Sequence, residues 1–209
     1  LDTTEERAPY RVMWKILRDK DALVIPPTGA PEIEKTPVDL PFPSFETLDA
    51  KGSLDENGTA TYRIHITARG DDELLFRALL RQISPSQYDE FIQKFSQGLG
   101  FGGTTSNAEV SKPDATANPL DIAFDYKREK TGDWSNYRIV PQFPPVYLPV
   151  LDESNPPQVP IELGPKHVEN ATTALKLPVG WSATLPEAVH VRTPFAIFDK
   201  TYRLDKGTL

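Results

Sequence analysis

Residues 45–69 read FETLDAKGSLDENGTATYRIHITAR, and this stretch decides the fold. It holds two runs in which apolar and polar side chains alternate, and Asn57-Gly58 lies between them. Alternation is typical of a strand with one buried face, and Asn-Gly favours a tight turn because both residues tolerate a positive φ. The stretch therefore predicts an antiparallel β-hairpin. The side chains expected on its buried face are those of Tyr62, Ile64 and Ile66.

The spacing of the apolar residues becomes helical between residues 71 and 98. Acidic residues open the first helical stretch, where they favour a helix N-terminus. Ser84-Pro85 then supplies a cap residue and a proline at the first position of a second helix. These patterns predict a helical hairpin that docks on a sheet. The side chains expected at this contact are Leu75, Leu79, Phe91, Ile92 and Phe95.

Short strand-like runs separated by Pro, Gly and Asn resume after residue 104. Proline accounts for 21 of the 209 residues, roughly double its ordinary usage. Because proline is excluded from helix interiors and central strands, this content favours many turns and strand edges. We expect a mainly β (α+β) fold, specifically an antiparallel β-sandwich with the helical hairpin inserted at about residues 71–98.

Prolines are concentrated between residues 26 and 43, among small and charged residues, which favours an extended connection. The expected organisation is a terminal segment at 1–25, a Pro-rich connection at 26–43 and a β-sandwich domain at 44–209. The sequence begins at Leu1 with neither an initiator Met nor a basic leader region. We therefore interpret it as an internal piece of a longer protein.

Composition excludes several classes of function. The formal net charge is −7 and the basic residues are scattered, so a nucleic acid is not expected as a partner. No apolar run approaches the ~20 residues that a membrane-spanning helix needs. The absence of cysteine removes thiol nucleophiles, thiolate metal sites and disulfides.

The titratable residues show no pattern of a metal or cofactor site. His65, His167 and His190 are not spaced as helical metal ligands, and we interpret them as two strand residues and one loop residue. The acidic stretches at 55–57 and 152–153 lack the ligand alternation of a calcium loop. We expect neither a metal nor a cofactor.

Aromatic side chains offer the remaining candidate site. Trp134 and Trp181 could stack on the apolar face of a sugar, although aromatic residues in strands are more often part of the core. They are the candidate ligand-binding residues for a glycan or a peptide.

Two stretches near the start, Leu1-Asp2-Thr3-Thr4 and Ala22-Leu23-Val24-Ile25, resemble the last strands of a bacterial transglutaminase-like domain. In that superfamily a Leu-Asp-Pro/Ala/Thr-Thr step carries the acid of a Cys-His-Asp triad. The resemblance implies that Asp2 is the remnant of such a triad, inactive alone because no cysteine accompanies it. The stretches at 160–164, 177–181 and 185–186 are similar to the β region of unknown function that follows these domains.

The resemblance implies a non-catalytic accessory or structural domain of a larger protein of peptidase or acyltransferase type. Its expected partner is the upstream transglutaminase-like domain of the same chain, which it would support or position. Its expected location is the periplasm or the cell envelope of a bacterium. The alternative function is a β-sandwich module that binds a carbohydrate or a peptide, and a cryptic hydrolase is the least favoured.

Overall fold

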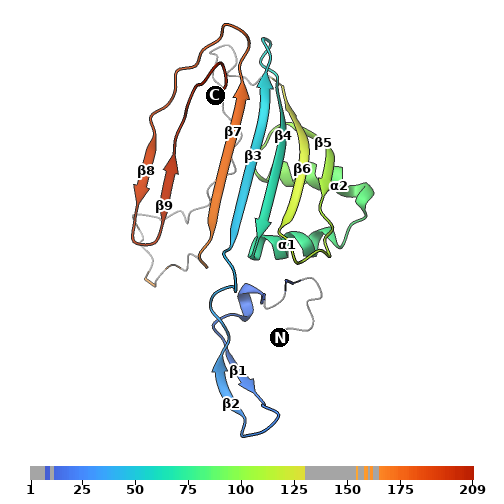
Figure 1. Ribbon diagram of the computed structural model, residues 1–209, viewed down its shortest axis with the longest axis vertical. Helices are drawn as coiled ribbons and strands as arrows, with labels where there is room; N and C mark the ends of the chain where they lie inside the picture. Colours follow the sequence, from blue (N-terminus) through green and yellow to red (C-terminus); the bar gives the residue numbers. More distant parts are fainter. Residues whose placement is uncertain (1–7, 10–11, 130–153, 155–157, 160, 162–164) are drawn as a thin grey trace.

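The computed structural model describes residues 8–9, 12–129, 154, 158–159, 161 and 165–209. Its centre is a five-stranded sheet of strand order β5-β6-β4-β3-β7, and two further sheets have two strands each (Figure 1). The strands of the central sheet are β3 (Phe45–Leu54), β4 (Ala60–Arg69), β5 (Thr104–Val110), β6 (Leu120–Arg128) and β7 (Val168–Lys176). The two small sheets contain β1 (Asp21–Val24) and β2 (Glu32–Lys35), and β8 (Val189–Arg192) and β9 (Ile197–Lys200).

The hairpin predicted from residues 45–69 is confirmed as β3 and β4, which pair antiparallel with Leu48 opposite Ile66. The side chains of Tyr62, Ile64 and Ile66 are buried, as the alternation predicted. The pairing of β3 with β7 is parallel, so the central sheet is mixed and not purely antiparallel. This difference arises because β7 returns to β3 from far along the chain, where no short turn dictates its direction.

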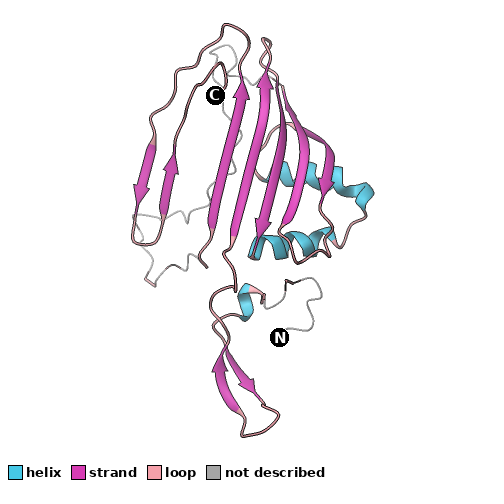
Figure 2. Cartoon of the chain, in the orientation of Figure 1, coloured by secondary structure: helices cyan, strands magenta, loops and turns pink. Residues whose placement is uncertain are grey.

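A helical hairpin covers one face of the central sheet, and the mainly β fold with this hairpin is confirmed (Figure 2). The helices are α1 (Asp71–Leu80) and α2 (Tyr88–Gly98). The 3₁₀ turn η2 (Pro85–Gln87) leads directly into α2, and a second one, η1 (Lys15–Leu17), precedes β1. The second sheet of a sandwich stays a prediction, because the layer that the described residues place against this face is helical.

The inward face of α1 differs from the one predicted. Leu75 and Leu79 are 49% and 39% exposed, whereas Leu74, Phe76 and Leu80 are buried. The helix is turned because Glu73 and Arg77 both lie inside and form an ion pair of 2.8 Å. In α2 the prediction is closer, since Ile92 is buried and Phe91 and Phe95 pack against the core.

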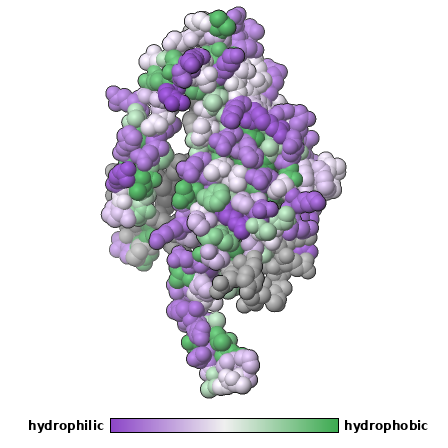
Figure 3. Space-filling model, viewed as in Figure 1, coloured by the Kyte–Doolittle hydropathy of each residue, from purple (hydrophilic) through white to green (hydrophobic). Residues whose placement is uncertain are grey.

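The opposite face of the sheet is polar, and hydrophilic side chains cover much of it in the view of Figure 3. The free edge of β5 is covered by side chains of α2. The Thr105 N–H donates to Gln93 Oε1 at 2.7 Å, and the Ala108 N–H donates to Asp89 Oδ1 at 2.8 Å. Such cover keeps the amides of an edge strand from pairing with another chain.

The N-terminal strands β1 and β2 form a hairpin that projects away from the central sheet (Figure 1). The boundary expected between residues 25 and 26 lies in the loop of this hairpin, and the connection expected at 26–43 contains strand β2. Pro26 and Pro27 therefore lie where the chain turns, so the proline content marks a loop here and not only an extended connection.

Candidate functional site

Polar and titratable side chains meet where β3 and β7 begin, beside the first turn of α1. We call this group the β3–β7 junction, and its members are Ser44, Glu46, Asp72, His167 and Glu169. Ser44 and Glu46 come from the start of β3, Asp72 from α1, and His167 and Glu169 from the start of β7. The parallel register brings them together, because it sets Glu46 opposite Glu169.

Ser44, His167 and Asp72 form a chain of polar contacts. The Ser44 hydroxyl lies 3.0 Å from Nδ1 of His167, and Nε2 of His167 lies 3.5 Å from Asp72 Oδ2. The Ser44 hydroxyl also donates to the Arg69 carbonyl oxygen at 3.3 Å. Since a hydroxyl has one proton, Ser44 then accepts from the Nδ1–H of His167. Nε2 on the other side of the ring faces the Asp72 carboxylate.

Glu46 is the carboxyl group most affected by this setting. Burial, followed by the negative charges of Asp72 and Glu169, raises the pKa of Glu46 to about 7. Like-charged residues directly opposite each other in a sheet are unfavourable. Glu46 therefore changes its protonation state close to neutral pH, which makes this junction the most strongly perturbed acidic site among the described residues.

The order Ser44–His167–Asp72 is that of a hydrolytic triad, but the surroundings of Ser44 favour a structural role. Ser44 is only 8% exposed. A Cβ on Gly70 would lie 2.5 Å from the Ser44 hydroxyl, so the backbone at the start of α1 lies directly against it. A nucleophile must be open to its substrate, whereas this hydroxyl joins the beginning of β3 to the end of β4.

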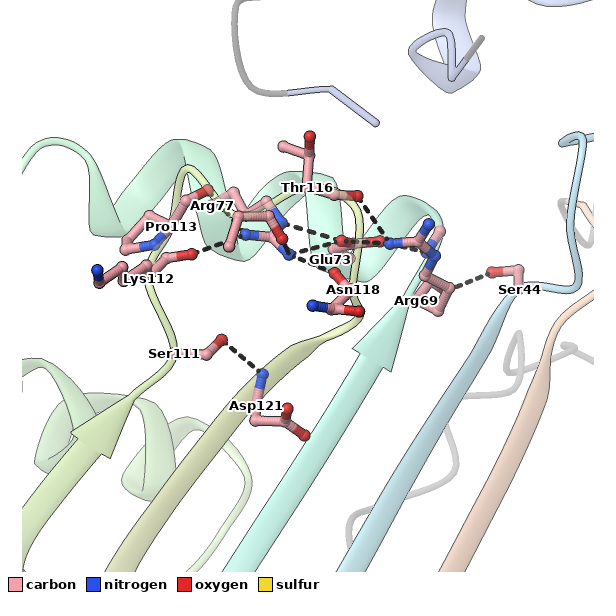
Figure 4. A network of polar contacts seen from close by, with 12 residues as sticks. Ser44, Arg69, Glu73, Arg77, Ser111, Lys112, Pro113, Thr116, Asn118 and Asp121 are labelled. Atoms are coloured by element: carbon pink, nitrogen blue, oxygen red, sulfur yellow. Dashed lines mark hydrogen bonds and ion pairs between the residues drawn. The ribbon is translucent and has the colours of Figure 1, made fainter. Parts of the chain in front are cut away.

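A second polar network lies next to the junction and is buried (Figure 4). Glu73 accepts from both Arg69, at 3.1 Å, and Arg77, at 2.9 Å. Arg77 is completely buried and donates to four backbone carbonyl oxygens of the loop between β5 and β6. These carbonyl groups belong to Lys112, Pro113, Ala115 and Asn118. Because the charged guanidinium of Arg77 binds these carbonyl oxygens, the network fixes the β5–β6 loop to α1.

The structure distributes the histidines over three places. His65 is exposed on the polar face of the sheet, with Nε2 3.4 Å from Asp121 Oδ1. His190 is exposed on β8, where Nδ1 lies 2.8 Å from Asp199 and this hydrogen bond lowers the pKa of that carboxyl. His167 lies at the β3–β7 junction, between Ser44 and Asp72. No sequence pattern indicated this, because Ser44 and His167 are far apart along the chain.

The other candidates do not form a shared site among the described residues. Asp2 and Trp134 lie outside the described residues, and so does the acidic stretch at 152–153. Trp181 is partly buried and packs against the hydrophobic core. In the hairpin loop, Asp55 accepts from the backbone N–H groups of Asn57 and Thr59 at 2.9 and 2.8 Å, which is turn chemistry.

In the part of the chain that the structure describes, no three His, Asp or Glu side chains are arranged to hold a metal ion. No helix among these residues is long and apolar enough to cross a membrane. Comparisons with protein-family models, with curated proteins and with solved structures give no match to this chain.

Proposed function

We propose that this chain is a non-catalytic accessory domain of a larger transglutaminase-like protein of peptidase or acyltransferase type, and that the β1–β2 hairpin holds the catalytic domain. The resemblance of residues 1–25 to the last strands of such a domain supports the first part. It also implies a bacterial periplasmic or cell-envelope location, which belongs to the proposal. The observation that carries the second part is the apolar face of the hairpin.

This apolar face is solvent-exposed in the described structure. Leu23 and Ile33 lie directly opposite each other and are 62% and 66% exposed, and Ile25, which follows β1, is 72% exposed. A two-stranded hairpin alone is marginally stable in water. Neighbouring exposed apolar side chains on a projecting element are typical of a surface that another domain covers.

The base of the hairpin is fixed to the central domain. Arg18 forms an ion pair with Asp71 in the first turn of α1, and Arg18 Nε donates to the Met13 carbonyl oxygen at 2.9 Å. The Thr36 hydroxyl donates to the Leu17 carbonyl oxygen at 2.7 Å and accepts from the Lys20 N–H at 2.9 Å. The apolar face is therefore held in place relative to α1, as expected of a surface that positions a neighbouring domain.

The proposal is tested by thermal unfolding of this chain with and without the upstream domain. A domain that covers the hairpin should raise the unfolding temperature of the β region by several degrees, because it binds the folded state alone. The double variant Leu23→Ser/Ile33→Ser should remove this gain. It should leave the unfolding temperature of the isolated chain nearly unchanged, since both side chains are exposed there.

Val179→Ser is the matched control, because Val179 is 98% exposed and lies outside the hairpin. It should keep the full gain in unfolding temperature. If the upstream domain gives no gain at all, the hairpin is not its docking surface and the proposal fails. Saturable binding of a glycan or a peptide, lost in Trp181→Ala, would then favour the binding module.

A further inference from the structure

The two ends of β7 are held differently. At the far end, Leu175 and Leu177 are buried, and Leu175 exchanges two backbone hydrogen bonds with Leu209. At the start, the side chains of residues 168–172 are exposed. Side-chain burial therefore stabilises the far end of β7, whereas its start depends more on pairing with β3 and on the contacts of the β3–β7 junction.

His167, directly before β7, connects this start to two other elements. The Val168 N–H donates to the Ser44 carbonyl oxygen at 3.1 Å. The His167 ring lies between the Ser44 hydroxyl and the Asp72 carboxylate. A protonated imidazole has an N–H on both nitrogens, so it donates to Ser44 and attracts Asp72 by its charge at the same time. A neutral imidazole has one N–H and no charge, so its attraction to α1 is weaker.

Glu46 brings a second titratable group to the same place. It lies directly opposite Glu169 in the parallel register, with both side chains on the same face of the sheet. Its partner on β4 is the uncharged Ala68. Burial, followed by the negative charges of Asp72 and Glu169, raises the pKa of Glu46 to about 7. Loss of the Glu46 proton therefore brings three carboxylates together, which is unfavourable.

Two arginines of the neighbouring elements are already paired. Arg69, at the end of β4, donates to Glu73, and Arg18 forms an ion pair with Asp71. Protonation of His167 is therefore the change at the junction that offsets its carboxylates, and histidine commonly changes charge near neutral pH. With both titratable groups protonated, the junction carries one net negative charge, and with both deprotonated it carries three.

We propose that the β3–β7 junction is a pH-dependent switch that controls whether the start of β7 is paired with β3. In the acidic form, His167 bears the charge that attracts Asp72, and Glu46 is neutral. In the alkaline form, the mutual repulsion of three carboxylates separates residues 168–172 from β3, and the buried leucines keep the far end of β7 in place. Local opening of this kind costs less free energy than unfolding of the whole domain.

Amide hydrogen exchange of the full chain tests the switch at about pH 5.5 and about pH 8.5. Val168 donates its N–H to β3, so by alternation Asn170 and Thr172 do too. Their protection factors, which correct for the faster exchange of any amide in base, should fall at least about tenfold at the higher pH. The protection factors of Ala174 and Lys176 should stay within about threefold, because this end of β7 stays paired.

Three variants identify the groups that drive the switch. Glu46→Gln cannot ionise, so it should keep residues 168–172 protected at the higher pH. His167→Gln keeps a hydrogen-bonding side chain without a charge, so it should lower their protection at the lower pH. His65→Gln is the matched control, because Nε2 of His65 lies 3.4 Å from Asp121 in a similar contact on the polar face of the sheet. It should show the pH dependence of the parent.

Protection of Asn170 and Thr172 that does not change with pH would overturn the proposal. So would an equal fall at Ala174 and Lys176, which would mean that the whole sheet unfolds. The parent chain decides both outcomes even where a variant fails to fold. If Glu46→Gln retains the full pH dependence, another group drives the opening and the junction is not the switch.

Discussion

Glu46 shows how one residue makes the stability of this fold depend on pH. Its pKa is raised from 4.5 to about 7, so the folded chain binds a proton more tightly than the unfolded chain does. The unfolded state therefore holds fewer protons between these two values, and the free energy of unfolding falls as the pH rises from about 4.5 to about 7. Above pH 7 the ionised carboxylate lies near Asp72 and Glu169.

Glu46→Gln should remove this dependence. At pH 8 the variant should be more stable than the parent by roughly 1–3 kcal/mol, because a neutral amide replaces the ionised carboxylate. At pH 4.5 the two proteins should be alike. Chemical denaturation at both pH values measures the difference. Asp49→Asn is the control on the same strand, since Asp49 is exposed on the polar face. If the parent and Glu46→Gln showed identical pH profiles of stability, Glu46 would not be the group responsible.

Arg77 is the second residue whose removal should have a large effect. Arg77→Met removes one of the two arginine partners of Glu73, and it removes the guanidinium donor from four backbone carbonyl groups of the β5–β6 loop. Breaking a buried ion pair on one side costs about 3–5 kcal/mol. Arg81→Met, an exposed change in the residue after α1, should cost under about 1 kcal/mol. Similar denaturation midpoints for both variants would show that the network contributes little.

At the scale of elements, the sequence correctly predicted structure that depends on residues close together in the chain. The β3–β4 hairpin lies at the residues predicted because its turn and alternation act over a few residues. The prediction of the inward face of α1 was wrong. Leu75 and Leu79 fit the helical spacing as well as Phe76 and Leu80 do, so spacing alone could not tell the two faces apart. The buried Glu73–Arg77 pair turns the helix, and nothing near it in sequence shows that the loop at 111–119 supplies its carbonyl partners.

A matched pair of leucines tests this orientation. Leu80 is 1% exposed and Leu79 is 39% exposed, although they are neighbours in α1. Leu80→Ala should lower the free energy of unfolding by about 2–5 kcal/mol, because it leaves a cavity in the core. Leu79→Ala should cost less than about 1 kcal/mol. Urea denaturation of both variants measures the difference, and the reverse order would restore the face expected from the sequence.

At the scale of the whole molecule, the pairing of β3 with β7 could not be predicted. Its partners are separated by more than a hundred residues, and its parallel direction has no turn signal. The β3–β7 junction depends on this pairing, so Ser44 and His167 could not be connected from sequence either. The candidates Asp2 and Trp134 lie outside the described residues and stay predictions.

Metal independence is an expectation for the whole chain. No ligand group was found in the sequence or among the described residues. The unfolding temperature should therefore stay within about one degree when EDTA is added, since a structural metal contributes directly to folding free energy. A fall of several degrees, reversed by one particular cation, would show that a site exists. Scanning calorimetry with and without the chelator measures this.

The side-chain cover on β5 limits how copies of this chain can assemble. A sheet with two open edges can add molecules at both ends and grow into a filament. Here Gln93 and Asp89 already bond to amides of the β5 edge, so among the described residues strand pairing between copies through the central sheet is restricted to its β7 side. Two molecules that meet through that side use it up in both, so such association ends in a twofold pair.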